Sequence, residues 1–233
     1  MMNTERISPL KKILSVFIPF ILMPALVISG LFVFRARGML WMITAVCALT
    51  LVIFFCGFEK RKTGTRRLVL TAVFIAFASI GRIICSPLPG VNPITAVTVL
   101  AAVYLGGEAG FMIGAFSVLI SNIAASQGTW TPFQMLAWGL IGMVAGLLGR
   151  FLEGHKIRLC IYTLTAGVAY SLIMDIFTVI WEMNGFTVSA YRAVIITALP
   201  FTATYALSNV LFTLLLEKPF REKLGRIKVK YEI

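Results

Sequence analysis

The chain alternates long apolar segments with short polar or charged connections. A membrane-spanning helix needs about 20 predominantly apolar residues, and most of these segments reach that length. The fourth segment is the shortest; its alternative reading is a re-entrant piece, which is tolerated only where other protein covers its backbone. The pattern predicts eight helices, at residues 13–34, 39–58, 67–86, 92–106, 109–125, 133–150, 158–182 and 192–216.

The first apolar segment follows Lys11 and Lys12 and runs for 22 residues. A secretory signal peptide has a shorter apolar region followed by a small-residue cleavage site. We therefore expect a retained helix. Pro19 and Pro24 should distort it, because each removes one backbone donor.

The longest uncharged stretch runs for 41 residues, from Ala109 to Gly149. It is too long for one membrane helix, and a polar insert, Ser126–Pro132, interrupts it. Gly and Pro in this insert favour a turn, and its Trp is suited to a membrane interface. Two interpretations stay open at this point: an interfacial turn with an aromatic anchor, or a cover over a small neutral solute.

The composition places the chain in a membrane. Hydrophobic residues make up 59% of it, the mean hydropathy is +0.95, and soluble domains are nearer 45–50% apolar. The expected class is therefore an all-α polytopic membrane protein. A net charge of +12 is then best explained by basic cytoplasmic loops, and we reject a nucleic-acid partner.

The positions of Lys and Arg agree with eight spans. With both termini in the cytoplasm, 17 of the 21 basic residues lie inside, as the positive-inside rule requires of a plasma-membrane protein. The four outside are Arg35, Arg37, Arg82 and Arg192. Three polar, turn-rich loops then face outward: residues 86–93, the insert and residues 182–187. This arrangement favours a solute site near the outer face.

Catalytic signatures are absent from the sequence. The four cysteines form no CxxC pair, and His155 is the single histidine, so no metal site and no cofactor are expected. No nucleophile–base set and no Gly-rich phosphate loop with a Lys occur either. If this protein moves a solute with ATP, another subunit must hydrolyse the ATP.

Two ionisable residues lie within apolar segments, where a charge is costly and usually has a partner or a function. Arg82 is near the outer end of the third segment, and its alternative role is to extend to lipid headgroups. Asp175, in the seventh segment, could pair with Arg82, bind solute or serve as a protonated structural carboxyl.

Amide and aromatic side chains gather around the insert. Gln134 and Trp138 share one helix face, and Asn122 and Ser126 share another, because each pair is four residues apart. Asn209 is a further amide within the eighth segment. Such groups can line a small-molecule pocket, and interhelical hydrogen bonds without a ligand are the alternative.

Small residues four apart recur on several predicted helices and allow close helix approach. For Gly110 and Gly114, and for the glycines at 139, 142, 146 and 149, we favour packing within the protein. For Ala72 and Ala76, on the third segment, packing within the protein and contact with a partner both stay open.

Several motifs carry a family resemblance. They are Gly81-Arg82, Pro93-Ile-Thr-Ala, Leu105–Phe111, Ser121-Asn122, Gln127–Met135 and Trp138-Gly139. With them, the stretch from Arg67 to Arg221 resembles the substrate-binding S components of energy-coupling factor (ECF) vitamin transporters. The resemblance implies a six-helix bundle, within a domain at residues 63–233 that ends in a basic cytoplasmic tail. Residues 1–62 then form a two-helix membrane extension.

The resemblance also implies a function. S components capture a vitamin at the extracellular face, topple in the membrane, and dock on a transmembrane coupling subunit with two cytosolic ATPases. Ala72 and Ala76 match the AxxxA pair of the docking helix. A cobalamin-like vitamin is favoured; folate, pantothenate and queuosine precursors remain open. The candidate ligand-binding residues are Arg82, Asn92, Asn122, Gln127, Trp130, Thr131, Gln134, Trp138, Asp175 and Asn209.

Two other classes of function remain. A structural or assembly membrane protein would bind partner helices through its Gly and Ala faces, without a ligand. An intramembrane enzyme is disfavoured because no catalytic set is present, although turnover dependent on Asp175 would revive it.

Overall fold

The structure is a computed structural model that describes residues 17–34, 39–58, 64–183 and 185–231. Helices and short connections make up this part of the chain, and it contains no strand. The helices are η1 (Ile18–Leu22), α2 (Met23–Phe34), α3 (Met39–Phe58), α4 (Gly64–Cys85), α5 (Ile94–Leu105), α6 (Gly107–Ala125), α7 (Thr131–Leu147), α8 (Gly149–Leu152), α9 (Lys156–Glu182) and α10 (Val188–Tyr231).

Four of the described helices, α4, α6, α9 and α10, are long and apolar enough to cross a membrane. Shorter apolar helices lie at Ile18–Gly30, Trp41–Ile53, Ile94–Leu105 and Thr131–Leu147. These eight helices coincide with the eight predicted segments, so the prediction of an all-α, multi-pass membrane protein is confirmed. The predicted boundary at residues 62 and 63, and the basic residues Arg6, Lys11, Lys12, Lys60, Arg61, Lys62, Arg35 and Arg37, lie outside the described residues.

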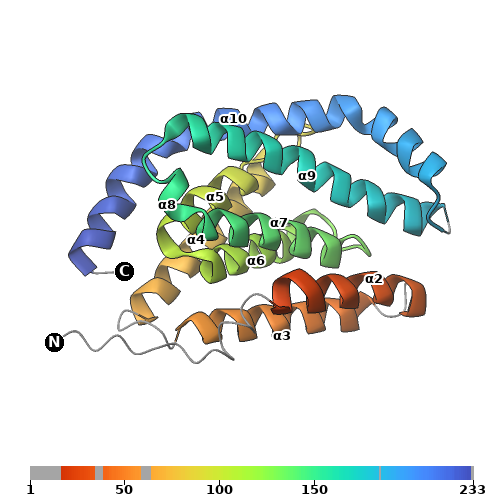
Figure 1. The fold of residues 1–233 in the computed structure, drawn as a ribbon, viewed down its shortest axis with the longest axis horizontal. Helices are drawn as coiled ribbons and strands as arrows, with labels where there is room; N and C mark the ends of the chain where they lie inside the picture. Colours follow the sequence, from red (N-terminus) through yellow and green to blue (C-terminus); the bar gives the residue numbers. More distant parts are fainter. Residues whose placement is uncertain (1–16, 35–38, 59–63, 184, 232–233) are drawn as a thin grey trace.

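The last helix is longer than predicted. The apolar pattern ends near residue 216, but α10 continues to Tyr231 and contains Pro200 and Pro219. The segment predicted to be a basic tail is therefore helical, since Lys, Arg and Glu are good helix formers. Figure 1 shows α10 arching along α9 and then curving toward the C-terminus, as expected for a helix with internal prolines.

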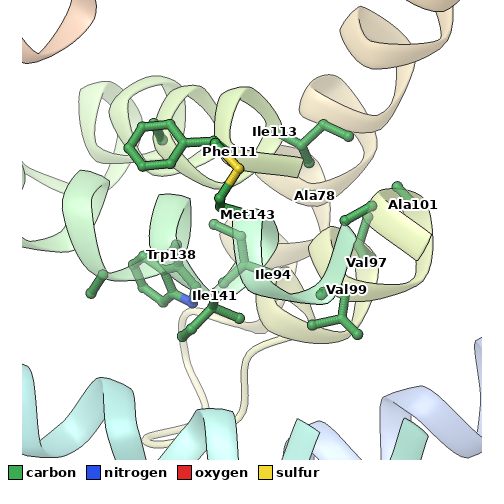
Figure 2. Close-up of a cluster of buried hydrophobic side chains, with 14 of the residues drawn as sticks. Ala78, Ile94, Val97, Val99, Ala101, Phe111, Ile113, Trp138, Ile141 and Met143 are labelled. Atoms are coloured by element: carbon green, nitrogen blue, oxygen red, sulfur yellow. The ribbon is translucent and has the colours of Figure 1, made fainter. Parts of the chain in front are cut away.

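The shortest predicted segment forms the centre of the bundle. All twelve residues of α5 are buried, and the helix packs against α4, α6, α7 and α10. Twelve residues span only about 18 Å, less than the hydrocarbon core of a bilayer. Figure 2 shows Val97, Val99 and Ala101 of α5 beside side chains of α6 and α7. Because protein surrounds this helix on all sides, its ends need not reach both membrane surfaces.

Helices α6 and α7 pack with their backbones in contact. A Cβ added to Gly110 would overlap the Gly142 carbonyl oxygen, and one added to Gly142 would overlap the Gly110 carbonyl oxygen. Gly146 lies against the backbone of Gly107 in the same way. The small residues of these two helices therefore serve packing inside the protein, as predicted.

The two N-terminal helices lie on the opposite side of the bundle from α9 and α10 (Figure 1). Helix α3 contacts α6 and α7, and α2 contacts α3 and α7. Pro19 lies in the π-helical turn η1, next to Pro24 at the start of α2. The helix is therefore irregular at the prolines, where distortion was predicted.

A buried ion pair fastens α4 to the turn between α5 and α6. Arg67 is 1% exposed; its Nε donates to the Leu105 carbonyl at 2.8 Å, and its Nη2 lies 3.1 Å from Glu108 Oε2. Gly106 makes the tight turn possible with a φ of 91°. The sequence analysis counted Arg67 as a cytoplasmic loop charge, whereas the structure places it inside the protein.

Candidate functional site

A cavity of about 290 Å³ lies at the end of the bundle where α4 and α6 finish and α7 begins. This is the end predicted to face outward. The α4–α5 loop and five helices line it, and the wall is a mixture of aromatic, polar and small residues. The lining residues are Arg82, Ile83, Ser86, Leu88, Pro89, Gly90, Val91, Asn92, Ser121, Ala125, Gln134, Trp138, Tyr170, Phe201 and Tyr205.

Arg82, in the last turn of α4, crosses to α6 rather than extending away from the protein. Its Nη1 donates to Ser121 Oγ at 2.7 Å and to Asn122 Oδ1. Its guanidinium carbon lies 5.5 Å from the centre of the Trp138 ring. An arginine held by two hydrogen bonds and a cation–π contact has a defined orientation in the cavity wall.

Asn122 is the centre of a hydrogen-bond network behind the cavity wall. It is 1% exposed, and its Nδ2 donates to Thr131 Oγ1 at 3.0 Å and to Gln134 Oε1 at 2.8 Å. Gln134 then reaches the cavity and donates from Nε2 to the Tyr170 hydroxyl at 3.2 Å. The predicted group of amides is thus brought together, but Asn122 acts on the cavity through Arg82 and Gln134.

Aromatic side chains of three helices form one side of the cavity. Trp138 stacks on Tyr170 with ring centres 4.1 Å apart, and Tyr170 lies 5.1 Å from Tyr205. The Trp138 Nε1 donates to both Thr95 Oγ1 and the Tyr205 hydroxyl, at 2.9 Å each. These bonds satisfy the indole donor, so a rigid aromatic wall is held at this depth.

Three residues of the insert lie outside the cavity lining. Gln127 donates from Nε2 to the Leu119 carbonyl at 2.9 Å and accepts from Thr131 Oγ1 at 2.9 Å. Trp130 is 37% exposed, and its ring covers Gly128. In this structure the side chains of the insert contact the insert itself and the end of α6. Ligand contact by Gln127, Trp130 and Thr131 stays a prediction.

The α4–α5 loop lines the cavity, whereas the three insert residues above do not. Asn92 lines it and joins two elements: its backbone N–H donates to Ser208 Oγ at 3.1 Å, and its Oδ1 accepts from the Ile94 N–H at 3.0 Å. Gly90, with a φ of 75°, lets the loop lie close to Thr204 of α10. The loop is therefore attached to α5 and α10.

Asp175 and Asn209 do not line the cavity. Asp175, on α9, is 7% exposed; it does not line the cavity and forms no ion pair with Arg82. Asn209 is fully buried on α10, and its Nδ2 is 3.5 Å from the Thr163 carbonyl of α9. Of the alternatives considered for Asn209, this geometry corresponds to the interhelical hydrogen bond.

The candidate residues do not include Tyr170, Tyr205 and Phe201 of the aromatic wall, or Thr95, which supports it. Tyr170 is an isolated tyrosine in an apolar helix, and no local pattern separates it from a tyrosine at the membrane interface. Tyr205 stands near Asn209 in the sequence, but its bond to Thr95 joins α10 to α5 across 110 positions. A contact between residues so far apart in the sequence can be identified only in the folded structure.

The predicted docking residues are on the surface. Ala72 and Ala76 are both exposed on α4, on a face that also carries Val69, Val73 and Ile80. Buried neighbours such as Thr71, Ile75 and Ser79 point to the opposite side, toward the bundle. In the described part of the chain, this face is therefore free to contact lipid or another protein.

One family model matches most of the chain. Residues 62–221 match the family model described as the S component of the ECF-type riboflavin transporter. No curated protein and no solved structure matches the chain significantly. The matching region contains α4 to α9 and most of α10, and hence every residue that lines the cavity. The protein therefore belongs to the S-component family of ECF-type transporters, whose members are transport subunits and not enzymes.

Proposed function

We propose that this protein captures a vitamin in the cavity described above, at the extracellular face of the plasma membrane, and delivers it inward with an ATP-driven coupling module. The observation that carries the proposal is the cavity itself. It lies in the family-matched region, and aromatic rings, amides and one arginine converge on it. A largely apolar cavity with a few fixed polar groups is the usual form of a small-molecule site.

The size of the cavity supports a vitamin of about flavin size. A volume of about 290 Å³ is at the lower end for ligand sites, which run from about 300 to 1,000 Å³. Cobalamin, which the sequence resemblance favoured, is much larger than a flavin and would require this cavity to open considerably. The description of the matching family as a riboflavin transporter component is a second reason to favour a flavin-sized ligand.

The proposed partners are a transmembrane coupling subunit and two cytosolic ATPases. The sequence contains no phosphate-binding loop, so the energy must come from another chain. The exposed Ala72 and Ala76 support docking, since small residues four apart let a second helix approach closely. The excess of Lys and Arg on the opposite side from the cavity supports an outward-facing site and two cytoplasmic termini.

Transport assays test the proposal directly. The chain is purified together with the coupling module, reconstituted in vesicles, and supplied with a panel of vitamins that includes riboflavin and cobalamin. We expect ATP-dependent uptake and tight binding of one member of the panel. Mass spectrometry of any ligand that is retained through purification identifies the natural compound. An absence of both uptake and tight binding across the panel would overturn the proposal.

A structural or assembly protein is the second candidate, and the exposed alanine face favours it equally. It differs in one measurable respect, because it needs no ligand. Under that function, replacement of Gln134 leaves activity intact, whereas bulky residues at Ala72 and Ala76 abolish association. The vitamin-capturing protein should instead lose ligand binding when Gln134 is replaced, because Gln134 lines the cavity.

A further inference from the structure

The cavity wall carries one unbalanced charge. Among the described residues that line the cavity, Arg82 is the only one with a formal charge. Asp175 of α9, for which pairing with Arg82 was one of three alternatives, forms no ion pair with it. The protein groups closest to the guanidinium are the neutral Ser121, Asn122 and Trp138. A cation at membrane depth without an anionic partner is energetically unfavourable unless another molecule supplies the partner.

The hydrogen bonds of Arg82 leave part of the guanidinium available. A guanidinium has five N–H donors in one plane. Both bonds to α6 start from Nη1, toward Ser121 Oγ and Asn122 Oδ1. Within the described residues, Nε and Nη2 have no hydrogen-bond partner. These two nitrogens form the edge of the guanidinium that matches two oxygen atoms side by side.

The surrounding residues hold this edge in place before any ligand binds. Asn122 is itself fixed by Thr131 and Gln134, at 3.0 and 2.8 Å, so the acceptor that positions Arg82 cannot rotate freely. Trp138 is covered by Arg82 on one side and stacks on Tyr170. An arginine that is already ordered loses little further freedom when it binds a ligand.

The aromatic wall restricts what can lie next to this edge. The indole N–H of Trp138 is occupied by Thr95 and Tyr205, so it is not a donor for a ligand. The lining residues contain no acidic group that could attract an amine. The site therefore favours a ligand that accepts hydrogen bonds over one that donates them at this position.

We propose that the ligand is a ring compound that presents two neighbouring acceptor atoms in one plane, either a carboxylate or a ring carbonyl beside a ring nitrogen, to Nε and Nη2 of Arg82. This inference rests on the proposed function and defines the chemical class of the vitamin. It also makes Arg82 the residue that selects between ligands with the same ring and different edges.

Pairs of probe compounds that share a ring and differ in their edge groups test the contact with Arg82 separately from the contacts of the ring. Nicotinate and nicotinamide differ in a carboxylate and an amide; pteridine-2,4-dione and 2,4-diaminopteridine differ in two carbonyls and two amines. Riboflavin is the probe for a larger ring with a carbonyl beside a ring nitrogen. Binding of each is measured by titration calorimetry to the purified full-length chain, as wild type, Arg82→Gln and Arg82→Lys. Arg192→Gln is the control, since Arg192 is an exposed arginine that does not line the cavity.

We expect the wild type to bind nicotinate more tightly than nicotinamide, or pteridine-2,4-dione more tightly than 2,4-diaminopteridine. The difference in affinity should be about tenfold or more in at least one of the two pairs, as expected for charge-assisted hydrogen bonds. Arg82→Gln should abolish this preference, and Arg82→Lys should recover only part of it, because an ammonium lacks the planar fork. Arg192→Gln should retain the preference in full. The thermal midpoint of each variant shows whether it remains folded.

Two results would overturn the inference while the proposed function stands. One is equal affinity for both members of every pair that binds; the other is a preference that survives in folded Arg82→Gln. If Arg82→Gln does not fold, the wild-type preference within the pairs decides. A wild-type protein that binds none of these probes and no member of the vitamin panel would remove the proposed function, and the inference with it.

Discussion

Faces of three helices in this protein carry small residues four apart, and the structure uses them in two different ways. On α6 and α7, Gly110 and Gly142 lie backbone against backbone inside the bundle. On α4, Ala72 and Ala76 are exposed beside Val73 and Ile80. The same sequence pattern thus serves internal packing in one place and remains free for a partner in the other. The surroundings of a small-residue motif, and not the motif, decide which role it has.

The largest effect should come from a side chain placed between α6 and α7. In Gly142→Val, the new carbons overlap the Gly110 backbone, which cannot move aside as a flexible side chain can. We expect destabilisation above the range of about 1–3 kcal/mol that is typical of overpacking, and a loss of monodisperse protein in detergent. The thermal midpoint measures it.

Gly225→Ala is the matched control for that substitution. A Cβ at Gly225 meets no atom within 4 Å, so the midpoint should stay the same or rise by the equivalent of up to about 1 kcal/mol, from helix propensity. A wild-type midpoint in Gly142→Val would mean that α6 and α7 are not packed as described.

The exposed face should respond to a similar change with a different loss. Ala76→Leu adds volume only at the surface of α4, so we expect about tenfold weaker assembly with the coupling subunit, or about 1.4 kcal/mol. Ligand affinity should remain nearly unchanged. Pull-down of the coupling subunit and ligand titration measure the two quantities separately.

Ala193→Leu, at an exposed position on α10, is the control for the docking face. It should assemble normally, because it lies on a different helix from Ala76. If ligand affinity in Ala76→Leu falls as much as assembly does, the assignment of this face to docking is wrong.

A smaller effect is expected where α6 and α7 are joined by polar side chains instead of glycines. Thr131→Val keeps the shape of the side chain but leaves Asn122 Nδ2 and Gln127 Oε1 each without one bond. We expect a loss of about 0.6–2 kcal/mol of stability, in the range for interhelical bonds in membranes. Thr165→Val, at an exposed hydroxyl that bonds only its own helix, should change stability by less than about 0.5 kcal/mol.

The smallest effect should come from the tip of the insert. Trp130→Phe keeps a ring over Gly128, and the cavity lies elsewhere, so ligand affinity should change less than about twofold, or 0.4 kcal/mol. Titration with the identified ligand measures the affinity. A tenfold loss would instead show that the insert closes over the bound ligand, as the sequence resemblance implied.

The positions of the helices could be predicted well. The bilayer core offers the backbone no hydrogen-bond partners, so long apolar segments are helical, and the thickness of the bilayer sets their length. The end of α10 could not, since hydropathy marks the end of the apolar region and not the end of the helix. Asn122, Gln134 and Trp138 could be named as candidate binding residues, because they flank the insert at helical spacing. Tyr170 and Tyr205 were not among the candidates, because their roles depend on contacts with Trp138, which is 32 and 67 positions away.

The sequence by itself determined that this is a multi-pass, all-α membrane protein, where its helices run, and which family motifs it carries. These properties follow from hydropathy and local spacing, which act along the chain. Only the tertiary structure decided that the α4–α5 loop lines the cavity, that Asp175 and Asn209 do not, and that Arg82 faces it without an acidic partner among the described residues. Each of these depends on which helices pack side by side, and that is set by contacts between residues far apart in the chain.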